Sequence, residues 1–231
     1  MFKGCWLRLK NNQKRPGFRR KTGLLIAISL AINYFICPQL HASIALSIEK
    51  IQLLGQNYQG EVQKRFRAWA QLIEKLKNAP VDEQLVEVND FFNQFNYQSD
   101  LESRNTEDYW KSPDEFIIDG GGDCEDYAII KYFTLVTLGV PTERLRITYV
   151  TNLTLNQAHM VLSYYPAPEA EPLILDSLEA KILKASKRPD LKPVYSFNGS
   201  GLWLAKQRGH NSLIGRPGSI DKWDELVKRM Q

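Results

Sequence analysis

The sequence predicts an α+β domain in which helices come first and an antiparallel sheet follows. Apolar residues recur at three- and four-residue steps through residues 43–97, which is typical of helices. Short runs rich in β-forming residues then occupy much of residues 144–204. Helices and strands do not alternate along the chain, and such segregation indicates an α+β fold rather than a parallel α/β sheet.

Two apolar stripes predict the N-terminal helices. Pro80 ends the first helix, and Asp82 is the expected cap of the second. The stripe residues are expected to pack in the core: they are Val62, Phe66, Trp69, Ile73 and Leu76 in the first helix, and Leu85, Val88, Phe92 and Phe95 in the second.

The middle of the chain is predicted to contain a loop and two more helices. Residues 98–111 are polar and are expected to form the loop. Ser112, Pro113 and Glu115 follow the pattern of a capping box with proline at the first helical position, which opens a short helix. Three glycines end that helix, and an apolar helix is predicted over 127–138.

The last third of the chain is predicted to form strands and one helix. The expected strands are 144–149, 158–165, 173–175, 194–197 and 202–204. From Ser219 onward the pattern predicts a capped amphipathic helix, with Trp223, Leu226 and Met230 facing inward. Nothing in residues 43–231 indicates an internal boundary, so we predict a single domain there.

The net charge of +4 arises from the N-terminal segment. Eight Lys and Arg residues precede residue 23, and no acidic residue precedes Glu49. Without these eight residues the chain has 22 basic against 26 acidic residues, a net charge of −4. The folded part therefore does not have the basic character expected of a nucleic-acid-binding protein.

Residues 1–42 have the layout of a secretory signal. After the basic stretch, Gly23–Cys37 is apolar over 15 residues, which is short for a helix that crosses a bilayer. Leu40-His41-Ala42 resembles a small-residue cleavage site before Ser43. A cleaved signal and a retained N-terminal anchor are both compatible with this pattern. The basic flank predicts export in either case, and we expect a periplasmic protein.

Cleavage would leave Cys124 as the only cysteine of the mature chain. An exported protein with one unpaired cysteine is a candidate for thiol chemistry, since structural cysteines outside the cytoplasm usually form pairs. Cys124 follows three glycines at the predicted start of a helix, where backbone N–H groups favour the thiolate. We therefore predict that Cys124 is a nucleophile and not a buried structural cysteine.

His159 and Asp176 are the predicted base and the residue that orients it. If 158–165 and 172–176 pair antiparallel with facing residue numbers summing to 335, His159 lies opposite Asp176. The carboxylate could then hold one imidazole nitrogen and direct the other toward the thiol. An odd shift in register would place the two residues on opposite faces. His210 has no assigned role.

A set of motifs resembles the bacterial transglutaminase-like cysteine proteinases over about residues 60–205. The residues that carry the resemblance are Asp108-Tyr109-Trp110, Gly122-Asp123-Cys124-Glu125-Asp126-Tyr127-Ala128, Lys131-Tyr132, Leu138-Gly139, His159-Met160-Val161-Leu162, Leu173-Ile174-Leu175-Asp176, Arg188-Pro189-Asp190-Leu191 and Pro193-Val194-Tyr195-Ser196-Phe197-Asn198.

The resemblance implies a transglutaminase/papain-like fold with a catalytic triad of Cys124, His159 and Asp176. It further implies a calcium-dependent endopeptidase of the periplasm. Its implied substrate is a large surface adhesin, cut near its N-terminus at a paired-alanine site to release it and control biofilm. The implied partner is an inner-membrane cyclic di-GMP receptor that sequesters the protease.

The residues around Cys124 give weaker, independent support for a calcium ion. Asp123, Glu125 and Asp126 place negative charge beside the thiol, which by itself would raise its pKa. A bound cation would reverse that effect, and carboxylate ligands suit calcium. The alternative is that Asp123 caps the helix while its neighbours interact favourably with the helix dipole.

Two other functions remain open at the level of sequence. The same triad could transfer the acyl group to an amine, or deamidate glutamine, because these reactions differ only in the acceptor that resolves the thioester. A non-catalytic binding domain is the second alternative, but a complete Cys, His and Asp set argues against it.

Overall fold

The computed structural model describes residues 46–204, 212–215 and 220–231. They belong to one compact unit that begins at Ala42. The predicted signal at 1–42, His210 and Ser219 lie outside the described residues. Within the part of the chain that is described, no helix is both long enough and apolar enough to cross a membrane.

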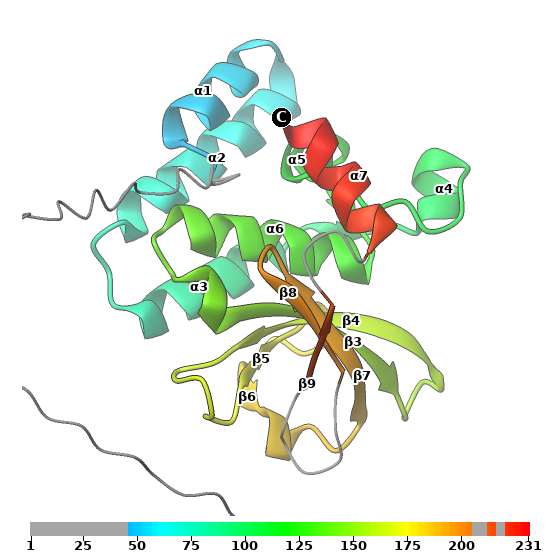
Figure 1. Cartoon of the computed structure of the whole chain (residues 1–231). Helices are drawn as coiled ribbons and strands as arrows, with labels where there is room; N and C mark the ends of the chain where they lie inside the picture. Colours follow the sequence, from blue (N-terminus) through cyan, green and yellow to red (C-terminus); the bar gives the residue numbers. More distant parts are fainter. Residues whose placement is uncertain (1–45, 205–211, 216–219) are drawn as a thin grey trace, which may run out of the picture. The chain divides into compact units, whose positions relative to one another are not determined.

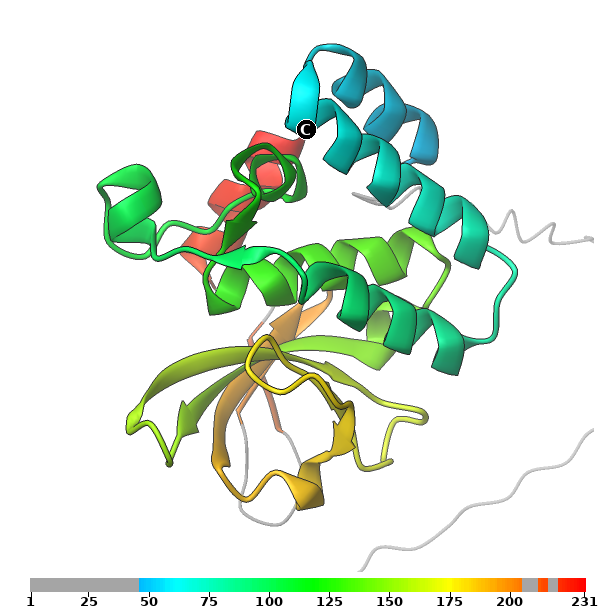
Figure 2. The ribbon, with the colours of Figure 1, turned by 180° about the vertical axis from the view of Figure 1, so that it is seen from behind.

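The described chain forms α-helices on one side of a seven-stranded antiparallel sheet, as the two opposite views in Figures 1 and 2 show. This arrangement confirms the α+β prediction. The helices are α1 Ile48–Gln56, α2 Gly60–Leu76, α3 Val81–Phe92, α4 Asp100–Arg104, α5 Pro113–Asp119, α6 Cys124–Thr137 and α7 Asp221–Met230, with short 3-10 helices η1 Thr142–Arg144 and η2 Ala185–Lys187.

The sheet has the order β6-β5-β4-β3-β7-β8-β9. Its strands are β3 Leu145–Asn152, β4 Gln157–Tyr164, β5 Leu173–Leu175, β6 Leu183–Lys184, β7 Leu191–Asn198, β8 Gly201–Leu204 and β9 Ser212–Gly215. A separate parallel pair joins β1 Asn96–Tyr97 to β2 Gly121–Gly122, directly before α6. All five strands expected from the sequence are present, whereas β1, β2, β6 and β9 were not predicted.

Helix α6 is the centre of the fold. Every residue from Glu125 to Leu135 is buried, so this helix is enclosed on all sides rather than amphipathic. Leu162 and Tyr164 of β4 belong to the same apolar core as α6, and so do Phe92 of α3 and Phe116 of α5. A residue at the start of α6 is therefore held in place by both the helical layer and the sheet.

The N-terminal helices confirm most of the predicted stripes, but Val62 is only partly buried, and Phe95 is partly buried and lies beyond the end of α3. Phe66, Trp69, Ile73 and Leu76 are all buried in α2. The predicted cap of α3 is wrong, because the helix begins at Val81 with Pro80 at the N-cap, and Asp82 lies within the first turn. Proline already has the φ angle that the start of a helix needs, so the helix begins two residues earlier than a cap at Asp82 would place it.

The predicted loop at 98–111 contains the short helix α4, which the sequence analysis missed. Ser99 and Glu102 form a capping box that starts this helix. The second capping box was predicted correctly, and the Ser112 N–H donates to the Glu115 carboxylate at 2.8 Å. Helix α7 also has its predicted inward face, with Trp223, Leu226 and Met230 buried.

The register between β4 and β5 differs from the prediction by two residues. Tyr164 pairs with Leu173 and Leu162 with Leu175, so facing residue numbers sum to 337 and not 335. Pro172, which the predicted register paired with Ser163, has no N–H to donate and instead accepts a hydrogen bond from Ala185 N through its carbonyl. Because the shift is even, the residues keep their predicted faces.

Candidate active site

Cys124 is the first residue of α6, as the sequence predicted. The approach to it depends on glycine: Gly120 ends α5 with a φ of 79°, in the left-handed region. A Cβ on Gly121 would overlap the carbonyl oxygen of Asn96, its partner in the β1–β2 pair. These two positions let the backbone turn tightly from α5 into α6, whose first N–H groups have no intrahelical acceptors.

The thiol of Cys124 lies between an acidic side chain and strand β4. Its Sγ donates to Glu125 Oε2 at 3.1 Å, and it also interacts with the backbone of Met160, the neighbour of His159. Burial and the Glu125 carboxylate raise the pKa of the thiol, while the Met160 backbone lowers it. The protein groups described here therefore favour the neutral thiol, and a nearby cation would oppose that effect.

His159 and Asp176 are brought together by the fold. His159 Nε2 lies 2.7 Å from Asp176 Oδ1, and both side chains are almost completely buried. Asp176 immediately follows the last residue of β5, so its side chain reaches His159 from beyond the end of the ladder. The contact through Nε2 leaves the imidazole Nδ1 as the nitrogen that can exchange a proton with a thiol.

Both oxygens of the Asp176 carboxylate have donors. Oδ1 also accepts from Leu178 N at 3.0 Å, and Oδ2 accepts from Arg188 Nη2 at 2.8 Å. Burial raises the pKa of Asp176, but the bond and charge of His159, with the bonds from Leu178 and Arg188, outweigh burial and lower it to about 2. Asp176 is thus held as a carboxylate in a fixed orientation.

The main chain of Asp176 is fixed by a second group that the sequence analysis did not identify. Its carbonyl oxygen accepts from Asn93 Nδ2 at 2.9 Å and from Lys131 Nζ at 3.2 Å. Lys131 lies on α6 and also donates to the side-chain oxygens of Asn89 and Asn93. Burial lowers the pKa of this lysine to about 7. The helix that carries Cys124 therefore also holds the backbone of Asp176.

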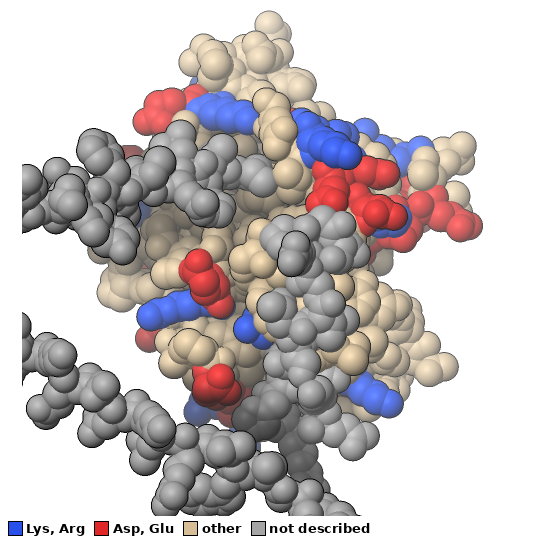
Figure 3. Space-filling model, in the orientation of Figure 1, with Lys and Arg blue, Asp and Glu red and all other residues tan. Residues whose placement is uncertain are grey.

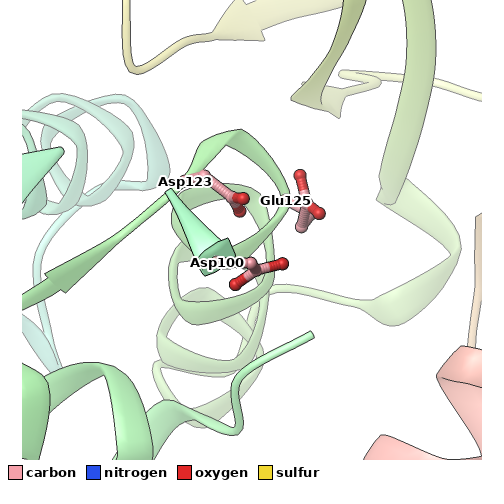
Figure 4. A group of neighbouring side chains, drawn as sticks. All are labelled: Asp100, Asp123 and Glu125. Carbon is pink, nitrogen blue, oxygen red and sulfur yellow. The ribbon is translucent and has the colours of Figure 1, made fainter. Parts of the chain in front are cut away.

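An acidic cluster, defined here as Asp100, Asp123 and Glu125, lies beside the thiol. Each residue contributes one carboxylate oxygen, and these three oxygens lie within 4.8 Å of one another. Figure 4 shows the three side chains. Asp100 Oδ1 and Asp123 Oδ1 are buried and accept no hydrogen bond from any described residue. Burial and the neighbouring carboxylates raise the pKa of Asp123 to about 9, and the pKa of Asp100 is also raised, chiefly by burial.

The predicted metal ligands divide into two groups in the structure. Asp123 and Glu125 are in the acidic cluster, whereas Asp126 accepts from two backbone amides, Lys111 N at 2.7 Å and Asp123 N at 3.2 Å. Asp126 thus completes the capping of α6, and Asp100 from α4 takes the third place in the cluster. The Ser99-x-x-Glu102 capping box was the sequence signal that could have revealed the helix carrying Asp100.

The segment after α4 fixes Asp100 and is itself held by the C-terminal helix. Asp100 Oδ2 accepts a hydrogen bond from Tyr109 N. Lys222 of α7 forms an ion pair with Asp108 at 2.6 Å, and Arg229 donates to the Trp110 carbonyl. Acidic and basic side chains gather where α4 and α7 reach the surface (Figure 3). The chain terminus therefore contributes to the position of a cluster residue far from it in sequence.

A cavity of about 690 Å³ lies on the face of the sheet turned away from α6. Its lining includes Val150, Val161 and Ile174, which form a small apolar cluster separate from the main core. Arg188 lines the cavity as well, and this arginine contacts Asp176. Cys124 and the acidic cluster are not among its lining residues, and we do not treat it as the reaction site.

The chain is similar to one family of cysteine proteinases and to solved structures of LapG. The model of the bacterial transglutaminase-like cysteine proteinase family matches residues 56–193. A structure of EGTA-treated LapG from Legionella pneumophila is 66% identical, with a TM-score of 0.75, over 81% of this chain and 99% of that chain. Calcium-bound LapG from the same organism is 67% identical, with a TM-score of 0.73, over 80% of this chain and 100% of that chain. No curated protein matches the sequence.

Proposed function

This chain belongs to the bacterial transglutaminase-like cysteine proteinase family and is a cysteine peptidase, and we propose that it is a calcium-dependent endopeptidase that cleaves a large surface adhesin near its N-terminus. The observation that carries the proposal is the buried His159–Asp176 pair, together with a cysteine at a helix N-terminus whose thiol contacts the backbone of Met160, the residue after His159. Membership of a proteinase family favours water, rather than an amine, as the acceptor that resolves the acyl-enzyme.

In the proposed mechanism each residue has a defined step. His159, held through Nε2 by Asp176, takes the thiol proton on Nδ1, and the Cys124 sulfur attacks the scissile carbonyl carbon. N–H groups at the start of α6 would stabilise the oxyanion that forms. His159 then gives its proton to the leaving amine, and water attacks the thioester with His159 as base, which restores the free thiol.

The acidic cluster fits a calcium ion on the chemistry of its donors. Calcium binds carboxylate oxygens, and two oxygens of this cluster are buried without hydrogen-bond donors. We propose that Asp100, Asp123 and Glu125 hold the ion, since the related LapG has a calcium-bound structure. A cation there would offset the negative field that disfavours the Cys124 thiolate and would fix the loop before α6.

The substrate is tested by mass spectrometry. Purified protein is incubated with the N-terminal region of the cell's large adhesin in calcium, with parallel samples in EGTA and with Cys124→Ala. Two fragments in the calcium sample alone are the expected result, with the cut at a paired-alanine site. A changed glutamine in an intact adhesin, or an unchanged adhesin, would contradict the proposal.

We also propose that the peptidase acts in the periplasm after export by residues 1–42. The support is the basic segment followed by the apolar run at Gly23–Cys37. The intact mass of protein from a periplasmic extract should correspond to a chain that starts near Ser43. A full-length chain in the membrane fraction would contradict cleavage and favour the anchor.

A partner follows from the same family resemblance. We propose that an inner-membrane receptor responsive to cyclic di-GMP sequesters the peptidase and withholds it from the adhesin. Purified receptor domain should retain the peptidase on a column in the presence of cyclic di-GMP and release it when the nucleotide is removed. Retention that does not depend on the nucleotide would contradict this regulation.

A further inference from the structure

Arg188 contacts the triad from outside it. It follows η2, where its own N–H donates to the Ala185 carbonyl at 3.0 Å and its carbonyl accepts from Leu191 N at 3.1 Å. Its backbone is therefore fixed in a tight turn ahead of β7. The residue is only 7% exposed, so its guanidinium reaches Asp176 in surroundings from which water is largely excluded.

The guanidinium joins two carboxylates in a fixed geometry. Nη2 lies 2.8 Å from Asp176 Oδ2 and 2.7 Å from Asp190 Oδ2, while Nε lies 3.0 Å from Asp190 Oδ1. Because the guanidinium is planar, the paired contacts with Asp190 set the direction in which Arg188 meets Asp176. Asp190 thus orients the arginine, and the arginine orients Asp176.

The orientation of Asp176 depends on having both oxygens held. Oδ1 accepts from His159 Nε2 and from Leu178 N. Without Arg188, Oδ2 would lose its charged donor, and the carboxylate could rotate about its terminal bond. Rotation would move the acceptor away from His159 Nε2 and release the imidazole from its present direction.

We propose that Arg188 is a positioning residue of the catalytic triad, which fixes the Asp176 carboxylate and through it the direction of the His159 ring. The proposal rests on the cysteine peptidase activity and not on the identity of the adhesin substrate. A buried ion pair is by itself weak evidence for a contribution to stability. The test must therefore separate the orientation of His159 from the stability of the fold.

The cavity behind the sheet makes such a test possible. Arg188 lines this space of about 690 Å³, and its buried Nη1 donates to no acceptor among the described residues. In Arg188→Ala, the volume of the missing guanidinium would be continuous with the cavity. Methylguanidinium from solution could then occupy it and restore the bond to Asp176 Oδ2, which methylammonium, with its different shape, would restore poorly.

The kinetic test compares Arg188→Ala with Lys187→Ala, which removes an exposed neighbouring cation. In calcium, Arg188→Ala should lower kcat about tenfold to hundredfold, the loss typical of removing an outer partner that orients a reactive group, with KM unchanged. Methylguanidinium should restore most of the lost kcat, whereas Lys187→Ala should match wild type. Arg188→Lys keeps the positive charge and should fold. It should have an intermediate kcat, because an ammonium lacks the planar fork of donors that a guanidinium has.

A spectroscopic test does not need a substrate. The chain has three histidines, so nuclear magnetic resonance of isotope-labelled histidine gives a simple spectrum, and His159→Ala assigns the signal. The proton on His159 Nε2 should be strongly shifted by its bond to Asp176 in wild type and in Lys187→Ala. In Arg188→Ala the signal should move or broaden, and methylguanidinium should return it.

The proposal is overturned if Arg188→Ala keeps both the wild-type kcat and the wild-type histidine signal. It is also overturned if kcat falls while the signal stays in place and methylguanidinium restores nothing, because the arginine then acts only on stability. Failure of the wild-type protein to cut the adhesin would contradict the proposed substrate instead, and the histidine signal would still decide the role of Arg188.

Discussion

The His159–Asp176 pair and the acidic cluster both serve Cys124, but they are built in opposite ways. Both oxygens of Asp176 accept hydrogen bonds, one of them from a cationic guanidinium. In the acidic cluster, Asp100 and Asp123 each have a buried oxygen without a donor. The pair is therefore complete with protein groups alone. In the cluster, no described Lys or Arg forms an ion pair with Asp100, Asp123 or Glu125, since the nearby Lys111 pairs with Asp119 and Asp126 instead.

The two regions also respond oppositely to pH. The surroundings of Asp176 lower its pKa to about 2, so they favour the ionised carboxylate. The surroundings of Asp123 raise its pKa to about 9, so they favour the protonated form. The comparison teaches that protein donors hold one carboxylate ionised in a fixed orientation, whereas in the other place burial and neighbouring carboxylates favour the protonated form, as expected for the proposed ion site.

The largest expected effect concerns the residue that lies between the two regions. Cys124→Ala should abolish peptide hydrolysis, because no other group in the site can form the thioester. Its thermal unfolding temperature should stay near that of wild type, since the alanine keeps the first position of α6. Cleavage assays and circular dichroism on the same preparation check this, and residual cleavage would remove the thiol from the mechanism.

The preorganised side of the comparison is tested by Asp176→Asn. The amide keeps the shape but can stabilise the wrong imidazole tautomer, and kcat should fall on the order of 10⁴-fold, as in the corresponding serine protease variant. Steady-state kinetics provides the measurement. A matched variant, Asp190→Asn, removes a carboxylate that contacts Arg188 and not His159, and it should cost much less. Equal losses in the two variants would contradict the special role of Asp176.

The ion-dependent side is tested by removing calcium. EGTA should inhibit cleavage and lower the unfolding temperature, and added calcium should reverse both changes. A ligand present at a hundred times its dissociation constant stabilises the folded state by about 2.7 kcal/mol. Magnesium should restore less, because it sheds water reluctantly and requires a more regular ligand set. Full activity in excess chelator would reduce the cluster to carboxylates that only cap helices.

A smaller effect follows from the opposite pKa shifts. In EGTA, the raised pKa of Asp123 means that the folded state keeps a proton which the unfolded state releases near pH 3.8. The free energy of unfolding should therefore fall as pH rises from about 4 to about 9. Asp176 contributes stability above pH 3.8 that is lost as pH falls toward 2. Thermal unfolding across this range, with and without calcium, should show the alkaline decline in EGTA and a smaller decline in calcium. Identical profiles would contradict the difference between the two regions.

Sequence was sufficient for the parts of the site that depend on local pattern. The glycine run and the following carboxylates predicted that α6 begins at Cys124, and the β-rich runs at 158–165 and 173–175 predicted the hairpin that brings His159 to Asp176. The exact register was not predictable from alternation alone, because a shift of two residues leaves every side chain on the same face. Pro172 was the residue that indicated the true pairing.

Residues that join the site from distant segments were harder to predict. Asp100 lies in a stretch that is polar throughout, and only the tertiary structure places it beside Asp123 and Glu125. Lys131 lies on an otherwise apolar helix, where periodicity predicts burial but not its contact with the Asp176 carbonyl. Arg188 was noted only as part of a motif, since nothing local in sequence shows that its guanidinium reaches the triad.

Calorimetric titration with calcium tests the contrast between the two regions most directly. Wild type should bind one ion, and Asp100→Asn should bind it at least about tenfold more weakly, because it removes a carboxylate whose Oδ1 has no other partner. The control, Glu107→Gln, changes an exposed acid in the same segment and should bind as wild type does. Asp176→Asn should also bind calcium normally, since its carboxylate is already satisfied by protein donors. No calcium heat in wild type, or equal affinity in wild type and Asp100→Asn, would contradict the account.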